Sequence, residues 1–254
     1  MGAAVATVTA LLDHCTVYAS DLAESKRFYD LAFEAIGFAG EPYVDGAFAE
    51  WHDFSIAQAR DDRPATRRLH VGFAAPSRVR GDAFWRTLTR AGYRDDGAPG
   101  RRPQYRDDYY GGFVLDPDGN SAEAVHHDVL RSDGGVIDHL WLRTRDPAAI
   151  REFYETVAPT AAIGLRVDEP ERVAWRHPKG SFTFVLGEPT EHVHLAFAVA
   201  DNAAVHEFHR VALAAGYRDN GAPGERPEYH AGYYAAYVLD PDGHNVEAVC
   251  HNRD

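Results

Sequence analysis

Short stretches of the chain alternate apolar and polar residues, and longer stretches between them carry apolar residues at helical spacing. The alternation in residues 11–19 places every second side chain, His14 among them, on one face, which indicates a strand. Apolar residues then recur every three or four positions over 22–36, after a cap at Ser20 or Asp21 and before a glycine, so we expect a helix there. Three short runs in 42–59 predict a meander of three strands. The first quarter of the chain therefore reads as βαβββ.

The same order of elements recurs three more times. The second unit has a predicted strand at 68–74, a helix at 80–91 and further strands within 92–127. The third has a strand from 137, a helix over 147–157 and strands in the runs LRVDE, RVAWRH and SFTFVLG. The fourth has a strand from 192, a helix over 203–215 and further strands within 216–251. Four βαβββ units make an α+β fold, with helices and strands in each unit.

An internal duplication explains this regularity. Residues 92–127 return at 216–251 with an offset of 124, about half of the 254-residue chain. The chain is therefore two tandem copies of one unit pair. We expect an N-terminal tail at 1–10, a first domain of two βαβββ units at 11–127, a linker at 128–135 and a second such domain at 136–254.

Charge and composition exclude several classes of partner. The 26 basic residues are outnumbered by 39 acidic ones, and the net charge of −13 disfavours nucleic acid. The only basic cluster, Arg67-Arg68 with Arg101-Arg102, is small and has no counterpart in the second copy. Apolar runs fall short of the ~20 residues that a membrane span needs, and no signal peptide is recognised. We expect a cytoplasmic monomer or homodimer that binds a small molecule, with Cys15 and Cys250 as packed thiols.

Metal-ligand residue types recur in both copies. Each copy has a histidine near the start of each unit and a glutamate in its last strand: His14, His70 and Glu123, then His139, His194 and Glu247. A carboxylate among small and apolar neighbours is costly unless a positive charge is close to it. Two imidazoles and one carboxylate can hold a divalent ion and leave its other positions open. Because the linker is short, we expect the three residues of each copy to share one site.

These residues resemble those of the vicinal oxygen chelate superfamily, which includes glyoxalase I, type I extradiol dioxygenases and bleomycin-resistance proteins. The turn Asp-Pro-Asp-Gly-Asn with a following glutamate, at 116–123, is the signature, and it returns at 240–247 with His244 in place of Asn120. The resemblance covers residues 11–252. It implies βαβββ units paired into two cupped, incomplete β-barrels with the metal inside, and it places the six histidines and glutamates at ligand positions.

The resemblance implies a metal-dependent enzyme whose substrate chelates the ion through adjacent oxygens. An extradiol-dioxygenase-like oxidoreductase is favoured by the set of two histidines and one carboxylate, with Fe²⁺ as the metal and Mn²⁺, Zn²⁺ or Ni²⁺ as alternatives. A glyoxalase-like lyase or isomerase is the second hypothesis, although its fourth ligand is matched only by Gln58 in the first copy. The third is a bleomycin-resistance-like binding protein without catalysis, a class that typically loses the metal ligands.

Candidate catalytic groups surround the predicted ligands. Phenols near a metal can donate to an oxyanion, and the candidates are Tyr109, Tyr110, Tyr233 and Tyr234, together with Tyr105 and Tyr229, with packing as the alternative role. Tyr110 and Tyr234 are the pair whose change to Phe would distinguish an oxyanion donor from a packing residue. Four further histidines, His52, His127, His230 and His251, could act as acid or base but read as ordinary polar residues. The repeated GAPGxRP segments at 97–103 and 221–227 predict rigid loops over the cavity mouth.

Overall fold

The computed structural model describes residues 12–38, 40–128, 135–161, 163–177 and 180–252. The predicted tail at 1–10 and most of the predicted linker lie outside these residues. The first unit consists of β1 (His14–Ala19), α1 (Leu22–Ile36), β2 (Tyr43–Asp45), β3 (Phe48–Trp51) and β4 (Phe54–Gln58). The second consists of β5 (His70–Ala74), α2 (Arg78–Arg90), β6 (Asp95–Arg101), β7 (Tyr110–Leu115) and β8 (Ser121–His126).

The second copy repeats this order. Its first unit is β9 (Ile137–Thr144), α3 (Pro147–Ala161), β10 (Gly164–Glu169), β11 (Arg172–His177) and β12 (Gly180–Leu186). Its second unit is β13 (Val193–Ala198), α4 (Asn202–Ala214), β14 (Arg218–Glu225), β15 (Tyr234–Leu239) and β16 (Asn245–Cys250). The described residues thus form four βαβββ units, and the predicted α+β class is confirmed.

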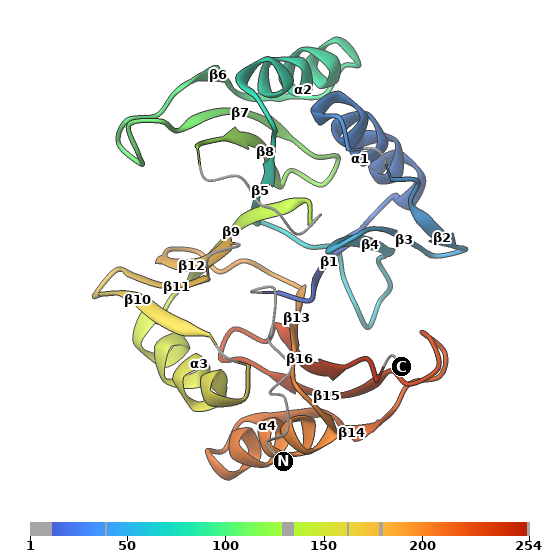
Figure 1. Ribbon diagram of the computed structural model, residues 1–254, viewed down its shortest axis with the longest axis vertical. Coiled ribbons are helices and arrows are strands. Elements are labelled where there is room, and N and C mark those ends of the chain that lie inside the picture. The colour runs from blue at the N-terminus through green and yellow to red at the C-terminus, as the bar shows by residue number, and fades with distance from the viewer. Residues whose placement is uncertain (1–11, 39, 129–134, 162, 178–179, 253–254) are drawn as a thin grey trace, which may run out of the picture.

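Two eight-stranded sheets contain these strands. Sheet I has the order β10-β11-β12-β9-β5-β8-β7-β6, and sheet II has the order β14-β15-β16-β13-β1-β4-β3-β2. Both are open sheets rather than closed barrels. In Figure 1 they form two arcs that open toward opposite sides, and the middle strands, β5 and β9 of sheet I and β1 and β13 of sheet II, lie in the central part of the view.

The pairing of the units differs from the sequence-based expectation. Strand β5 pairs antiparallel with β9, and β1 pairs antiparallel with β13. Sheet I therefore joins the second unit to the third, and sheet II joins the first unit to the fourth. The first strand of each unit is an edge strand of its own unit, and the partner it finds belongs to the other copy. The repeat boundary between the two copies is consequently not a boundary between sheets.

The helices cover the outer faces of the sheets, and their ends follow local signals. The Asp21 carboxylate accepts the N–H of Glu24 at the start of α1, and Gly37 ends the helix in the left-handed conformation with a φ of 86°. Helix α1 packs on α2, and α3 packs on α4, as Figure 1 shows. Buried aromatic side chains such as Trp51 and Trp175 fill the core between sheet and helix. Each large apolar side chain buried there contributes about 1.5–3 kcal/mol.

Two other features bear on the predicted functions. The GAPGxRP segments lie largely within the edge strands β6 and β14 rather than in loops, which corrects the prediction. Proline is tolerated there because an edge strand need not donate every N–H. Arg67 and Arg68 form ion pairs with Asp118 and Glu191, so this part of the basic cluster is neutralised. Among the described residues, no helix is long and apolar enough to span a membrane.

Candidate metal sites

The six histidines and glutamates form two groups, each drawn from both copies. Site A consists of His70, Glu123 and His139, and site B consists of His14, His194 and Glu247. In each group one possible ligand atom per residue lies within 4.8 Å of the others. The expected grouping of His14 with His70 and Glu123 is therefore wrong. The exchange of units between the sheets causes the difference, since His139 comes to site A on β9 and His14 comes to site B on β1.

Strand register places the ligands of site A side by side. Gly72 on β5 lies opposite His139 on β9 and opposite Glu123 on β8, so the two ligand side chains flank it on the same face. His70 is two positions before Gly72 and shares that face. Site B repeats the arrangement, with Ala196 on β13 between His14 and Glu247.

The distances between ligand atoms fit a shared cation. In site A, His70 Nε2 and His139 Nε2 are 3.1 Å apart, and they lie 3.2 and 3.4 Å from Glu123 Oε2. In site B the corresponding distances from Glu247 Oε2 are 3.7 Å to His14 and 2.9 Å to His194, with 3.1 Å between the imidazoles. Two ligands ~2.1 Å from an ion lie ~3.0 Å apart at right angles and ~3.4 Å apart at the tetrahedral angle. The site A distances match this range, whereas the site B distances run from 2.9 to 3.7 Å, with His14 farther from the carboxylate than the range allows.

Site A also contains a buried carboxylate oxygen that is available to a cation. Glu123 is 1% exposed, and its Oε1 has no hydrogen-bond partner among the described residues. A Cβ on Gly111 would overlap Oε1, and a Cβ on Gly72 would overlap the His139 ring. Two glycines thus keep space for the ligand side chains. A buried carboxylate oxygen with nothing to bind is costly, so its presence fits a site for a cation.

Aspartates hold the outer nitrogens of one histidine in each site. Asp138 contacts His139 Nδ1 at 2.9 Å, and Asp13 contacts His14 Nδ1 at 2.9 Å. When the imidazole Nδ1–H donates to a carboxylate, Nε2 keeps its lone pair for a metal. Burial lowers the pKa of each imidazole, but these carboxylates and the site glutamates outweigh it and raise the pKa of His14 to about 9 and of His139 to about 10.

Each of these aspartates also contacts a second histidine, which is not a candidate metal ligand. His127 Nε2 lies 2.9 Å from Asp138, and His251 Nε2 lies 2.8 Å from Asp13. In site B the chain extends to His230, whose Nε2 lies 2.9 Å from His251 Nδ1. His127 and His251, which were interpreted as ordinary polar residues, therefore contact the aspartates that hold the ligand histidines, and His230 joins them in site B. The sequence contained a signal for this network, since Asp-His occurs at 13–14 and again at 138–139.

The other ligand histidine of each site contacts a polar side chain of the last strand. His70 Nδ1 lies 3.1 Å from Ser121 Oγ, which donates to Asp96 at 2.7 Å. His194 Nδ1 lies 2.8 Å from the side-chain amide of Asn245, which contacts Asn220 at 2.9 Å. The outer nitrogen of His70 therefore leads to a carboxylate, whereas that of His194 leads to neutral amides.

Opposing forces act on the site carboxylates. Burial raises the pKa of Glu123, but hydrogen bonds from His139 and His70 outweigh it and lower the pKa to about 2. The pKa of Glu247 is lowered in the same way by His194. Both groups are therefore ionised at neutral pH, as a metal ligand must be.

The predicted tyrosines divide into two pairs. Tyr109 donates to Glu123 Oε2 at 2.8 Å, and Tyr233 donates to Glu247 Oε1 at 2.7 Å. Tyr110 instead donates to Asp82 of α2 at 2.6 Å, and Tyr234 contacts His206 of α4 at 2.8 Å. The hypothesis that Tyr110 and Tyr234 act as oxyanion donors is therefore not supported, because their hydroxyls point to the helices.

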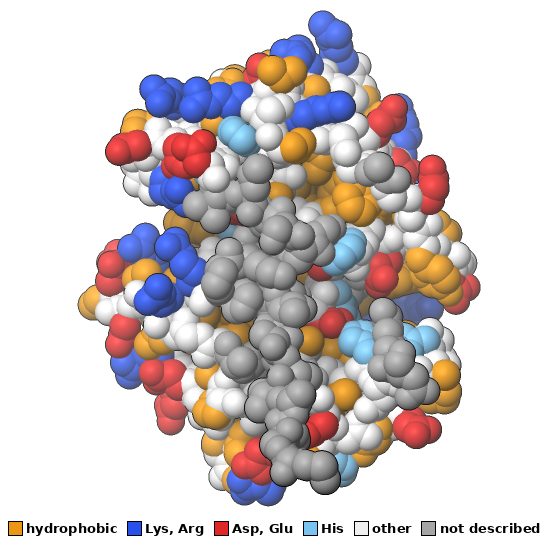
Figure 2. Space-filling model, viewed as in Figure 1, with side chains coloured by type: hydrophobic (Ala, Val, Ile, Leu, Met, Phe, Trp, Pro, Cys, Tyr) orange, Lys and Arg blue, Asp and Glu red, His pale blue; other side chains and the backbone are white. Residues whose placement is uncertain are grey.

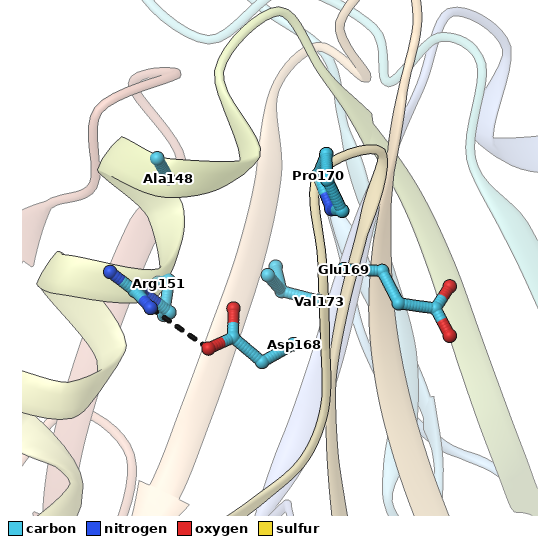
Figure 3. A pocket seen from close by; sticks show the side chains of 6 residues that line it. All are labelled: Ala148, Arg151, Asp168, Glu169, Pro170 and Val173. Atoms are coloured by element: carbon cyan, nitrogen blue, oxygen red, sulfur yellow. Dashed lines mark hydrogen bonds and ion pairs between the residues drawn. The ribbon is translucent and has the colours of Figure 1, made fainter.

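Two further candidates lie elsewhere. The Gln58 amide donates to the carbonyls of Ala19 and Ser20 and accepts the N–H of Leu22, at the end of β1 remote from His14. The pocket in Figure 3 lies between the start of α3 and the β10–β11 hairpin, and Arg151 there pairs with Asp168 at 2.8 Å. Neither place includes a residue of site A or site B.

Known proteins share this sequence and fold. The family model of the Glyoxalase/Bleomycin resistance protein/Dioxygenase superfamily matches residues 11–124. An uncharacterised protein of Pseudomonas aeruginosa is 34% identical over 123 residues, which cover 44% of this chain and 86% of that protein.

Solved structures cover nearly the whole chain. Glyoxalase I from Zea mays superposes with a TM-score of 0.63 at 15% identity, covering 94% of this chain and 92% of that one. A Bacillus subtilis structure provisionally assigned as a dioxygenase superposes with a TM-score of 0.60 at 13% identity, covering 95% and 85%. At these identities the likeness concerns the fold. Family match, relative and fold agree: the chain belongs to the Glyoxalase/Bleomycin resistance protein/Dioxygenase superfamily.

Proposed function

We propose that this chain is a metal-dependent enzyme whose small substrate chelates a divalent ion through two adjacent oxygens. One observation carries the proposal: each site brings two histidines and one carboxylate within 4.8 Å of one another. In the described part of the chain, no further histidine, cysteine or acidic residue joins either group. Such a set occupies one face of an ion and leaves the other positions for substrate and oxygen, as in non-haem iron(II) oxygenases. Extradiol-type dioxygenation is therefore the favoured reaction, with iron(II) as the metal.

The residues of each site have distinct tasks in this proposal. A bound iron(II) would supply Lewis-acid and oxygen chemistry. Asp138 and Asp13 fix the tautomer of His139 and His14, so that Nε2 faces the site. Tyr109 and Tyr233 each hold a carboxylate in place through one hydrogen bond.

A glyoxalase-like lyase or isomerase is the second candidate, and one observation favours it in site B. Glu50 on β3 lies opposite Ser55 of β4, which lies opposite Thr16 of β1, so Glu50 shares the ligand face of sheet II. Its charge acts on His14. A second carboxylate beside a redox-inert ion is suited to proton transfer. Position 174 is the counterpart in sheet I, and an alanine occupies it.

The test is metal analysis followed by turnover. Protein reconstituted anaerobically with iron(II) is expected to hold two ions per chain and to consume oxygen with a catechol. Glu123→Gln should remove the ion of site A, and Glu247→Gln that of site B, since each carboxylate supplies the only charge among its ligands. Absence of metal from wild-type protein after reconstitution would overturn the proposal and favour a binding protein. Metal without oxygen uptake, together with turnover of an α-ketoaldehyde thiol adduct by the zinc form, would favour the lyase.

A further inference from the structure

The two sites have the same ligands but different surroundings. Side chains at alternate positions of a strand share a face, so Trp141 and Arg143 of β9 follow His139 on the ligand face of sheet I. The matched positions after His14 on β1 are Thr16 and Tyr18. The duplication therefore gives pairs of positions at which the two sites can be compared directly.

Charge is the first difference. Arg143 lies opposite Val185 of β12, which lies opposite Arg172 of β11, so two guanidinium groups share the ligand face of sheet I. The matched row of sheet II consists of Tyr18, Ala57 and Phe48. Sheet II instead carries the Glu50 carboxylate, which is level with Thr16 and therefore nearer to His14 than Tyr18 is. The matched positions therefore carry two guanidinium groups near site A and one carboxylate near site B, where the charge of Arg63 also acts on Tyr18.

Of these two guanidinium groups, only that of Arg172 has an ion-pair partner among the described residues. Arg172 forms an ion pair with Glu169 at 3.2 Å, whereas the exposed Arg143 side chain forms no ion pair with any described residue. Figure 2 shows Lys and Arg side chains gathered on the left over β11 and β12, while histidines lie on the right where sheet II opens. A guanidinium without a carboxylate partner at the edge of a binding face is suited to an anionic group.

The kind of aromatic side chain is the second difference. Trp141 lies opposite His70 in the sheet, and the exposed Tyr105 ring meets Trp141 edge-on with centroids 6.2 Å apart. The Phe113 ring lies 5.9 Å from the His70 ring. Together with Tyr109, whose ring lies 6.5 Å from that of His139, these side chains flank site A with four aromatic rings, which favour an aromatic ligand.

Site B lacks an equivalent of this indole. At the position matched to Trp141, Thr16 contacts Ser55 at 2.8 Å, and both hydroxyl groups are buried. At the position matched to Phe113 stands Tyr237, whose ring lies 6.2 Å from that of His194. At these two positions site B therefore carries hydroxyl groups where site A carries the Trp141 indole and the Phe113 ring.

We propose that site A is the site for an aromatic ligand that carries a carboxylate in addition to two adjacent metal-chelating oxygens. The ring lies against Trp141 and Phe113, and the carboxylate meets Arg143. Arg143 lies four positions after His139 on β9, a span of ~13 Å, which leaves room for one ring between the metal ligands and the guanidinium. Site B discriminates against this ligand because Glu50 repels the carboxylate. This inference rests on the proposed metal binding.

Single-site proteins allow the test. Glu247→Gln leaves only site A, Glu123→Gln leaves only site B, and both are loaded with zinc and checked for one ion per chain. Calorimetry then compares 3,4-dihydroxybenzoate with catechol. The protein with only site A is expected to bind the carboxylated ligand at least ~10-fold more tightly than catechol, the gain of one charged hydrogen-bond pair. The protein with only site B should show no such preference.

Exchange of the matched residues identifies the cause. In the protein with only site A, Arg143→Tyr should abolish the preference, and in the protein with only site B, Tyr18→Arg should create it. Arg145→Tyr is the control for net charge, since Arg145 is exposed and paired with Glu188 at 2.6 Å. Equal preference in both sites, or a preference that survives Arg143→Tyr, overturns the inference while leaving metal binding intact. Failure of either protein to hold zinc would instead refute the proposed function on which the inference rests.

Discussion

His139 lies directly against Gly72 across the β5–β9 pair, in space that the side chain of any other residue would fill. The matched residue of site B, Ala196, lies opposite His14 and already carries a Cβ. The two copies have thus adjusted differently to the same contact. We expect Gly72→Ala to displace the His139 ring, to weaken metal binding at site A by ~10–100-fold and to destabilise the fold by about 1–3 kcal/mol.

The reciprocal change is the control for this experiment. Ala196→Gly removes a Cβ without creating an overlap, so site B should keep its ion with little change in affinity. Metal titration of both variants by calorimetry, with chemical denaturation in parallel, measures the two effects. Two ions bound by Gly72→Ala with wild-type affinity would show that the His139 ring is not held by this contact.

Metal binding should release protons. With a pKa of about 9 for His14 and about 10 for His139, we expect these two imidazoles to be protonated at pH 7 in the metal-free protein. A metal ion must displace the proton of the imidazole that it binds, so apparent affinity should rise ~10-fold per pH unit between about pH 6 and 8. Calorimetry in buffers of different ionisation enthalpy counts the protons directly.

The aspartate beside His139 provides the matched variant for this prediction. Asp138→Asn removes the charge that raises the pKa of His139, so the proton count at site A should fall while that at site B stays the same. An affinity that does not change with pH in the wild-type protein would contradict the assigned protonation states.

Removing the hydroxyl of Tyr109 or of its neighbour Tyr110 should have different effects on metal binding. Tyr109→Phe removes the hydrogen bond to Glu123 and should weaken metal binding at site A by ~10-fold or more. Tyr110→Phe removes only the bond to Asp82 and should cost about 0.5–1.5 kcal/mol of stability without affecting the metal. Metal content and thermal unfolding of the two variants decide the matter. A larger metal effect in Tyr110→Phe would show that the roles are reversed.

Local elements could be predicted because their signals are local. The helix α1 was expected at 22–36, the range it occupies, since Asp21 and Gly37 determine its ends. The six candidate ligands could also be found, because the duplication repeats each of them. The different roles of Tyr109 and Tyr110 could not be predicted. Strand β7 begins at Tyr110, so the alternation of faces along the strand does not tell which way the Tyr109 side chain points.

Which ligands share a site could not be predicted from the sequence, for a different reason. Strand β1 can pair through the same edge with β5 or with β13, and these two strands are matched copies with closely similar sequences. Backbone hydrogen bonds do not distinguish such partners. The choice between them depends on the packing of the whole fold, in which α1 lies against α2 although their units belong to different sheets.

The same equivalence predicts the behaviour of an isolated first copy. In residues 1–134 the edges of β1 and β5 lose their partners β13 and β9, which belong to the second copy. Because β5 matches β13 and β1 matches β9, two copies can restore both pairings, with β1 of each against β5 of the other. We expect this half to form a homodimer with two metal sites, measurable by light scattering and metal analysis.

Complementation would establish that each site of that dimer is shared between two molecules. A copy with His14→Ala and a copy with Glu123→Gln should each lose both sites as homodimers. A mixed dimer places both defects in one site and leaves the other intact, since His14 comes from one molecule and His70 with Glu123 from its partner. Mixing the two variants after unfolding should therefore restore one metal ion in each mixed dimer. If each site instead took all three ligands from one molecule, the mixture would bind no more metal than the separate variants.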